Sequence, residues 1–197
     1  MSVPMALVDF VPVILFAVAA VVLQRGLYHR MSKGAFALFA GGTIMTICAG
    51  LIKALWKLLY ALNVCDFDRL NQAFFPMQSV GFLLSGIAVV ALLTAPQKRK
   101  NTVYAAAAPA VFSGTMIVVA LLVLGSLGLY GGLGVLAARE KKHGAAVLFA
   151  VAFVLMLGMG YLSSRDFTQA SMNWIAEGVN LVGQGCFLLA AGKLVKR

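Results

Sequence analysis

The sequence predicts an all-α integral membrane protein, a bundle of six transmembrane helices built from two three-helix repeats. The first reason is composition: 62% of the 197 residues are hydrophobic, 11% are charged, and the mean hydropathy is +0.96. Soluble domains are roughly 45–50% apolar and 25% charged. The second reason is that the apolar residues form runs of membrane-span length between short polar connectors. The third is a likeness between the two halves of the chain.

The apolar runs define the expected spans. In chain order they lie at about 5–23, 34–52, 73–93, 102–138, 144–162 and 170–192. Because these runs fill nearly all of the chain, we interpret residues 1–197 as a single transmembrane domain. The first basic residue is Arg25, so the first run lacks the basic segment that precedes the apolar part of a cleaved signal peptide. We therefore expect the first run to remain as a span.

The two halves, residues 5–94 and 110–192, resemble each other across a basic and polar connector, residues 95–109. The run that begins Lys33-Gly34 is echoed by the run that begins His143-Gly144. The matched positions of the third and last spans are Asn71 with Asn173, Gln78 with Asn180, and Gly81 with Gly183. We interpret this order-preserving likeness as an internal repeat, a plan that is common in transporters.

The sequence leaves six spans and seven spans open. With 102–138 as one long span, the halves are inverted relative to each other. The basic groups at 25–33 and 98–100 then lie on one side, and those at 139–142 and in the C-terminal tail on the other, against the positive-inside rule. Two crossings of 102–138 give a three-plus-one-plus-three plan with all four basic groups on the cytoplasmic side. Because a span needs about 17–25 residues, two barely fit, and length favours six.

Small residues occupy one side of the expected fourth span. They are Gly125, Gly128 and Gly132. Such a surface allows close contact between helices. We favour packing inside the bundle, while a homodimer or a partner membrane subunit stays open as the alternative.

The last run, 170–192, carries a polar stripe. Its members are Asn173, Glu177, Asn180 and Gln184. They follow one another at intervals of four, three and four, which places them on one face of an α-helix. An ionisable group such as Glu177 costs a few kcal/mol inside a span and faces the bundle interior or a wet cavity. We therefore predict that the stripe binds a solute or ion, with Asn71 and Gln78 of the third span opposite.

The end of the second span alternates lysines and aromatic residues. Lys53 completes the set of candidate binding residues, although its place just beyond the apolar run favours an ammonium group that extends to the headgroups. The competing structural interpretation pairs Glu177 with Lys53 and uses the amides to hold helices together. Both interpretations stay open at this point.

Motifs for catalysis are absent from the sequence. It contains no H-E-x-x-H, no G-x-S-x-G, no phosphate-binding loop and no group of acids at metal-ligand spacing. We therefore expect no enzyme activity, no metal and no cofactor. The net charge of +10 resides in connectors between spans, where it orients the protein and contacts the lipid bilayer rather than nucleic acid.

These features favour a small multi-span carrier or channel that moves a small cationic or proton-coupled solute between the third and last helices. The alternative is a non-transporting module: a substrate-binding subunit of an importer, a sensor or an assembly partner. In layout alone the chain resembles small transporters built from three-helix units and the substrate-binding subunits of vitamin importers, which implies no site residues. Short connectors without appended domains favour a bacterial inner (cytoplasmic) membrane.

Overall fold

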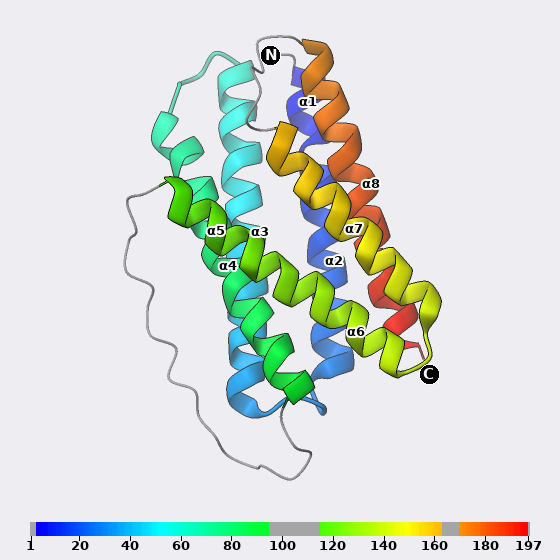
Figure 1. Cartoon of the computed structure of the whole chain (residues 1–197). Helices are drawn as coiled ribbons and strands as arrows, with labels where there is room; N and C mark the ends of the chain where they lie inside the picture. The colour runs from blue at the N-terminus through cyan, green and yellow to red at the C-terminus, as the bar shows by residue number, and fades with distance from the viewer. Residues whose placement is uncertain (1–2, 95–114, 163–169, 197) are drawn as a thin grey trace.

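The computed structural model describes residues 3–94, 115–162 and 170–196, and these residues form helices and no strand (Figure 1). Among the described residues, five helices are long and apolar enough to span a membrane: Val3–Leu27, Lys33–Ala61, Asp68–Thr94, Met116–Arg139 and Met172–Val195. This confirms the all-α fold, and the long apolar helices fit a multi-pass integral membrane protein. The expected fifth span is apolar but shorter over His143–Met159. The count of six and the duplication remain predictions, and the connector 95–109 lies outside the described residues.

The N-terminal span is broken near its start. Helices α1 (Val3–Val8) and α2 (Phe10–Leu27) are separated by Asp9. Pro12 accounts for the break, because proline has no amide hydrogen and its ring clashes with the carbonyl group four residues earlier, that of Val8. The break leaves Asp9 within the span, where its side chain is buried.

Two long helices, α3 (Lys33–Ala61) and α4 (Asp68–Thr94), form a tightly packed hairpin. The hydroxyl of Ser32 accepts a hydrogen bond from the amide of Ala35 at 3.2 Å and caps the start of α3. A Cβ atom added to Gly42 of α3 would lie 2.6 Å from the carbonyl oxygen of Gly81 in α4. These glycines therefore let the two backbones approach closely, a contact that we did not predict from the sequence.

The second half begins with one continuous helical run. It comprises α5 (Thr115–Ser126), the π-helical turn η1 (Leu127–Gly131) and α6 (Gly132–Arg139). A Cβ atom added to Gly86 of α4 would lie 2.5 Å from the carbonyl oxygen of Gly125 and 3.3 Å from the Cα of Gly128. Gly132 packs on Val89, which like Gly86 belongs to α4. The glycine surface of this run thus packs inside the chain, as we favoured.

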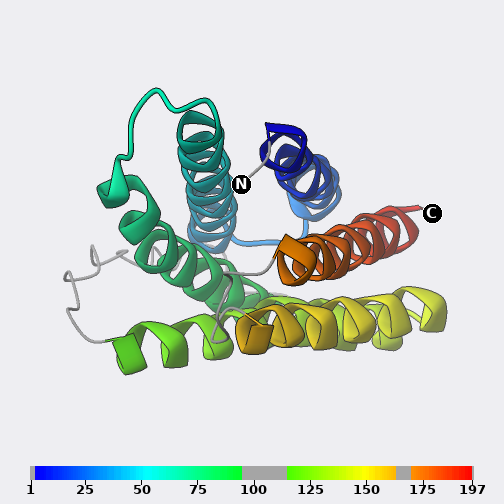
Figure 2. The ribbon, with the colours of Figure 1, turned by 90° about the horizontal axis from the view of Figure 1, so that it is seen from above.

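The helices form a closed ring. The chain ends with α7 (His143–Leu162) and α8 (Ala170–Val195). Each long helix packs against the next in chain order, and α8 returns to pack against α2. Figure 2 shows the same order from above, with α8 beside α2 and α7 alongside the α5–α6 run.

Helix α4 and the α5–α6 run point in the same direction. Near the start of the contact, the Ser79 hydroxyl donates to the carbonyl of Val118 at 3.0 Å, and near its end Arg139 Nη1 donates to the carbonyl of Leu93 at 3.2 Å. Residue numbers therefore rise together along both helices, which makes the contact parallel. Figure 1 shows both helices descending towards the same end of the bundle.

Basic residues gather at that end. Arg30, after α2, forms an ion pair with Glu140, after α6, and Lys142 Nζ lies 3.3 Å from Glu140 Oε2. Lys142 also donates to the carbonyls of Leu194 and Lys196, at 2.6 and 2.8 Å, and so satisfies the free carbonyls at the end of α8. We call this end of the bundle the basic end.

The six-span plan with inverted halves remains a prediction, but the described residues disagree with one of its consequences. That plan placed the basic groups at 25–33 and 139–142 on opposite sides, whereas the ion pair between Arg30 and Glu140 joins these connectors. The physical reason is the direction of the helices. Helices α2, α4 and α6 all end at the basic end, which brings the connectors after α2 and α6 together (Figure 1).

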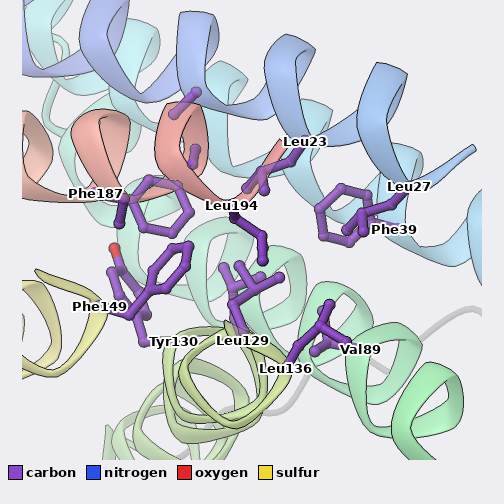
Figure 3. Packing of buried hydrophobic residues seen from close by; sticks show 14 of the residues in the cluster. Leu23, Leu27, Phe39, Val89, Leu129, Tyr130, Leu136, Phe149, Phe187 and Leu194 are labelled. Atoms are coloured by element: carbon purple, nitrogen blue, oxygen red, sulfur yellow. The ribbon is translucent and has the colours of Figure 1, made fainter. Parts of the chain in front are cut away.

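An apolar core fills the half of the bundle next to the basic end. Figure 3 shows Leu23 of α2, Leu129 of η1 and Leu194 of α8 packed close to one another in this core. Their side chains are at most 1% exposed. Within a membrane, van der Waals contact of this kind drives helix association, because lipid removes most of the hydrophobic contribution. This core closes the bundle at the basic end.

Candidate functional site: a central polar cavity

A cavity of about 160 Å³ lies inside the ring, lined by residues from α2, α3, α4, α5, α7 and α8. Its polar and charged lining residues are Asp9, Thr46, Lys53, Lys57, Gln78, Glu177, Asn180 and Gln184. It occupies the half of the bundle away from the basic end, because α8 enters this half at its start and reaches the apolar core near Phe187. The cavity therefore lies above the apolar core and within the expected membrane span.

Most of the predicted binding residues meet in this cavity. Asn180 and Gln184 of the polar stripe line it together with Glu177, and Gln78 of α4 faces them across the space. Asn71 and Asn173 lie about two turns before Gln78 and Asn180 on the same helices and are not among the lining residues. The ring thus brings the polar faces of the third and last predicted spans together around one space.

Glu177 is the most deeply buried acid of the cavity. Its side chain is 6% exposed, and its Oε1 atom has no hydrogen-bond partner in the described part of the chain. Its side chain lies within hydrogen-bond reach of the Asp9 carboxyl group, and its cationic neighbours are Lys57 and Lys53. A buried carboxyl group with a free acceptor atom is costly unless a proton, a cation or a ligand satisfies it.

Asp9 and Lys57 form an ion pair in the cavity wall. Asp9 is 7% exposed, and the Lys57 side chain is 21% exposed. Sequence reasoning missed both residues, because Asp9 lies near the start of the first apolar run and Lys57 in a segment typical of the headgroup region. The available signal was the spacing of Lys57 one turn after Lys53, which places both lysines on one face of α3.

Lys53 lies over an aromatic ring. Its Nζ atom is 4.1 Å from the centroid of the Phe74 ring and 5.6 Å from that of Phe75, a cation–π arrangement. The Lys53 ammonium group therefore lies in the cavity wall. We had predicted from the sequence that it extends to the lipid headgroups, and the structure differs in this respect. Among the ion pairs within the described ranges, none joins Lys53 to Glu177, the partner that the structural interpretation gave it.

Aromatic side chains form the floor of the cavity. The rings of Phe16 and Phe187 stack with centroids 5.5 Å apart, and Tyr130 lies 4.8 Å from Phe187. The Tyr130 hydroxyl is buried beside the side chain of Gln184, whose Oε1 atom has no hydrogen-bond partner among the described residues. Tyr130 belongs to the π-helical turn η1, and such turns occur frequently at functional sites. These rings belong to the apolar core, which closes the cavity on the side of the basic end.

Comparisons with protein-family models, curated proteins and solved structures give no match. The functional argument therefore rests on the chemistry of the cavity. Two acids and two lysines, supplemented by amides, can bind a small charged or dipolar molecule, because amides offer both donors and acceptors. The aromatic floor gives the same space an apolar side.

Proposed function

We propose that this protein is a small membrane carrier whose solute binds in the central cavity, with Glu177 as the group that takes up a proton or the cationic part of the solute. The observation that carries this proposal is the buried Glu177 carboxyl group, which faces the cavity with an unsatisfied oxygen. An engineered cavity of roughly 150 Å³ holds benzene, so this one suits a solute of roughly six to ten non-hydrogen atoms.

The closed floor favours a carrier over an open channel. A channel needs a continuous polar path, whereas the rings of Phe16 and Phe187 and the leucines beneath them separate the cavity from the basic end. A carrier exposes its site to one side at a time and keeps the other side closed. The cavity and its floor fit one such state.

The helix directions support a seven-span plan with parallel repeats, three-plus-one-plus-three. Helix α4 ends at the basic end, and α5 starts level with the first half of α4 and runs to the basic end again. The additional span of this plan falls on residues 95–114, which lie outside the described residues. The corresponding residues Gln78 and Asn180 both line the cavity, as expected for repeats related by an axis along the membrane normal. By the positive-inside rule the basic end is cytoplasmic.

Single cysteines test this topology. In a variant with Cys48, Cys65 and Cys186 replaced by serine, cysteines at Lys33, Lys141 and Lys196 are expected to react with an impermeant maleimide from the cytoplasmic side alone. A cysteine at Asn63, in the connector between α3 and α4, should react from the opposite side alone. Labelling of right-side-out and inside-out vesicles measures this. Reaction of the cysteines at 33 and 141 from opposite sides would contradict the parallel plan.

The Glu177→Gln variant tests the carrier. We expect it to abolish uptake by proteoliposomes, because an amide keeps the size of the side chain but cannot take up a proton or neutralise a cation. The measurement screens labelled amines, amino acids and monovalent cations under an imposed pH gradient, with a pH-sensitive dye inside the vesicles.

The matched control is Glu140→Gln at the basic end. It removes only a partly exposed acid, whose ion pairs are worth about 1 kcal/mol or less, and should leave uptake intact. Full transport by the Glu177→Gln variant would remove Glu177 from the mechanism. Wild-type protein that binds a solute but moves none would instead favour the non-transporting module.

A further inference from the structure

We infer that the cavity binds a small zwitterion, a molecule with one carboxylate and one ammonium group a few bonds apart, such as an α-amino acid. This inference rests on the proposed function in that it uses the same cavity, and it names the class of solute. It follows from how the four charged side chains of the cavity are already paired.

One pair of charges is satisfied inside the protein. Asp9 and Lys57 bind each other in the cavity wall. Glu177 lies beside the Asp9 carboxyl group, but no ion pair among the described residues gives Glu177 a cation or Lys53 an acid, and both side chains line the cavity. The cavity therefore presents one cationic and one anionic group that are open to a ligand.

Charge balance then selects the ligand. With Asp9 and Glu177 both ionised, two acids and two lysines sum to zero, so a ligand of zero net charge leaves the cavity neutral. A simple amine would pair with Glu177 and leave Lys53 without a counter-ion, and a simple carboxylate would do the reverse. An uncompensated charge at this depth is strongly unfavourable. A zwitterion satisfies both groups at once.

The geometry of each group fits this assignment. The Phe74 ring contacts the Lys53 ammonium from one side, and an ammonium group has three donors, so donors remain for a carboxylate. Glu177 Oε1 is an acceptor that lacks a donor, which an ammonium group of the ligand supplies. The apolar body of the ligand then meets Phe16 and Phe82, which also line the cavity.

A metal ion fits less well. Hard cations require several oxygen ligands, whereas this cavity places two lysine ammonium groups beside its two carboxylates. No cluster of three or more metal-ligating side chains occurs within residues 3–94, 115–162 and 170–196. An organic ammonium group matches the single free carboxylate oxygen better.

Matched ligands test the inference on purified full-length protein in detergent. The zwitterions are alanine, valine and leucine. Each is compared with the amine and the acid that share its carbon body: ethylamine and propanoate, isobutylamine and 3-methylbutanoate, 3-methylbutylamine and 4-methylpentanoate. Binding is measured by isothermal titration calorimetry. We expect at least one zwitterion to bind, and to bind at least tenfold more tightly than its matched amine and acid.

Two variants test which side chain binds the carboxylate of the ligand and which binds its ammonium group. Lys53→Gln should weaken zwitterion binding at least tenfold and leave the matched amine unaffected, while Glu177→Gln should weaken the zwitterion and leave the matched acid unaffected. Lys33→Gln, at the exposed start of α3, is the control and should change neither. Circular dichroism and gel filtration establish that each variant is folded. If a variant is not folded, the wild-type ligand series decides by itself.

Absence of binding by all three zwitterions would overturn the inference, as would an amine or acid that binds wild-type protein as tightly as its zwitterion. The outcomes are separable from those of the carrier proposal. Zwitterion binding without uptake contradicts the carrier and keeps the ligand class. Uptake of another solute without zwitterion binding contradicts the ligand class and keeps the carrier.

Discussion

Replacement of Gly42 with alanine is expected to lower the free energy of unfolding by about 2–3 kcal/mol, in the range measured for overpacked interiors. The added Cβ would lie 2.6 Å from the carbonyl oxygen of Gly81 and 2.7 Å from the amide nitrogen of Ser85. Both atoms belong to the backbone of α4, so a side-chain rotation cannot relieve the clash. Helices α3 and α4 must therefore move apart, and they would lose the contact that holds the first hairpin together.

Gly41 supplies the matched control, because it is the preceding residue of the same helix. A Cβ atom at this position meets nothing within 4 Å. Gly41→Ala should therefore leave stability unchanged or raise it by up to about 1 kcal/mol, since alanine is the better helix former. Unfolding of both variants by denaturant in mixed micelles measures the difference. Equal stability of the Gly41 and Gly42 variants would contradict the close packing of α3 and α4.

The second large effect concerns the ion pair between Asp9 and Lys57. Lys57→Met is expected to destabilise the protein by about 3 kcal/mol, because it leaves the carboxylate of Asp9 buried without its counter-ion. Asp9→Asn should cost less, about 1 kcal/mol, since the Lys57 side chain is partly exposed and its ammonium group can still be solvated. The same denaturant unfolding measures both variants.

The double variant Asp9→Asn with Lys57→Met separates a coupled pair from two independent residues. Neither charge remains, so we expect most of the stability lost in Lys57→Met to return. A double variant whose loss equals the sum of the two single losses would show that Asp9 and Lys57 do not stabilise each other. It would then also remove the premise that this pair is satisfied inside the protein.

The sequence alone predicted the class of protein and the polar face of the last helix. Membrane-length apolar runs can satisfy their backbone groups only as helices or closed barrels, and the spacing from Glu177 to Gln184 is helical. An acid inside such a helix has to face the interior, which is why Glu177 lines the cavity as the stripe predicted. The packing of Gly125 against α4 also followed from local residue size.

The partners of these residues were decided by the tertiary structure. The ion pair of Lys57 with Asp9 joins α3 to the break before α2, and no periodicity within one helix encodes such a contact. The cation–π contact of Lys53 depends in the same way on where α4 places Phe74. Side-chain spacing determines a face of a helix, whereas the element that meets this face depends on the order of helices around the ring.

The relative direction of the helices is a further property that the sequence left open and the tertiary structure decided. From the sequence, the length of 102–138 favoured one crossing and inverted halves, while the basic connectors favoured parallel halves. The parallel contact of α4 with the α5–α6 run brings Arg30 to Glu140. Composition and periodicity thus determined a membrane bundle with a polar interior face. Helix direction and charge pairing were decided only by packing between distant segments, because those contacts depend on three-dimensional neighbours that local sequence patterns do not specify.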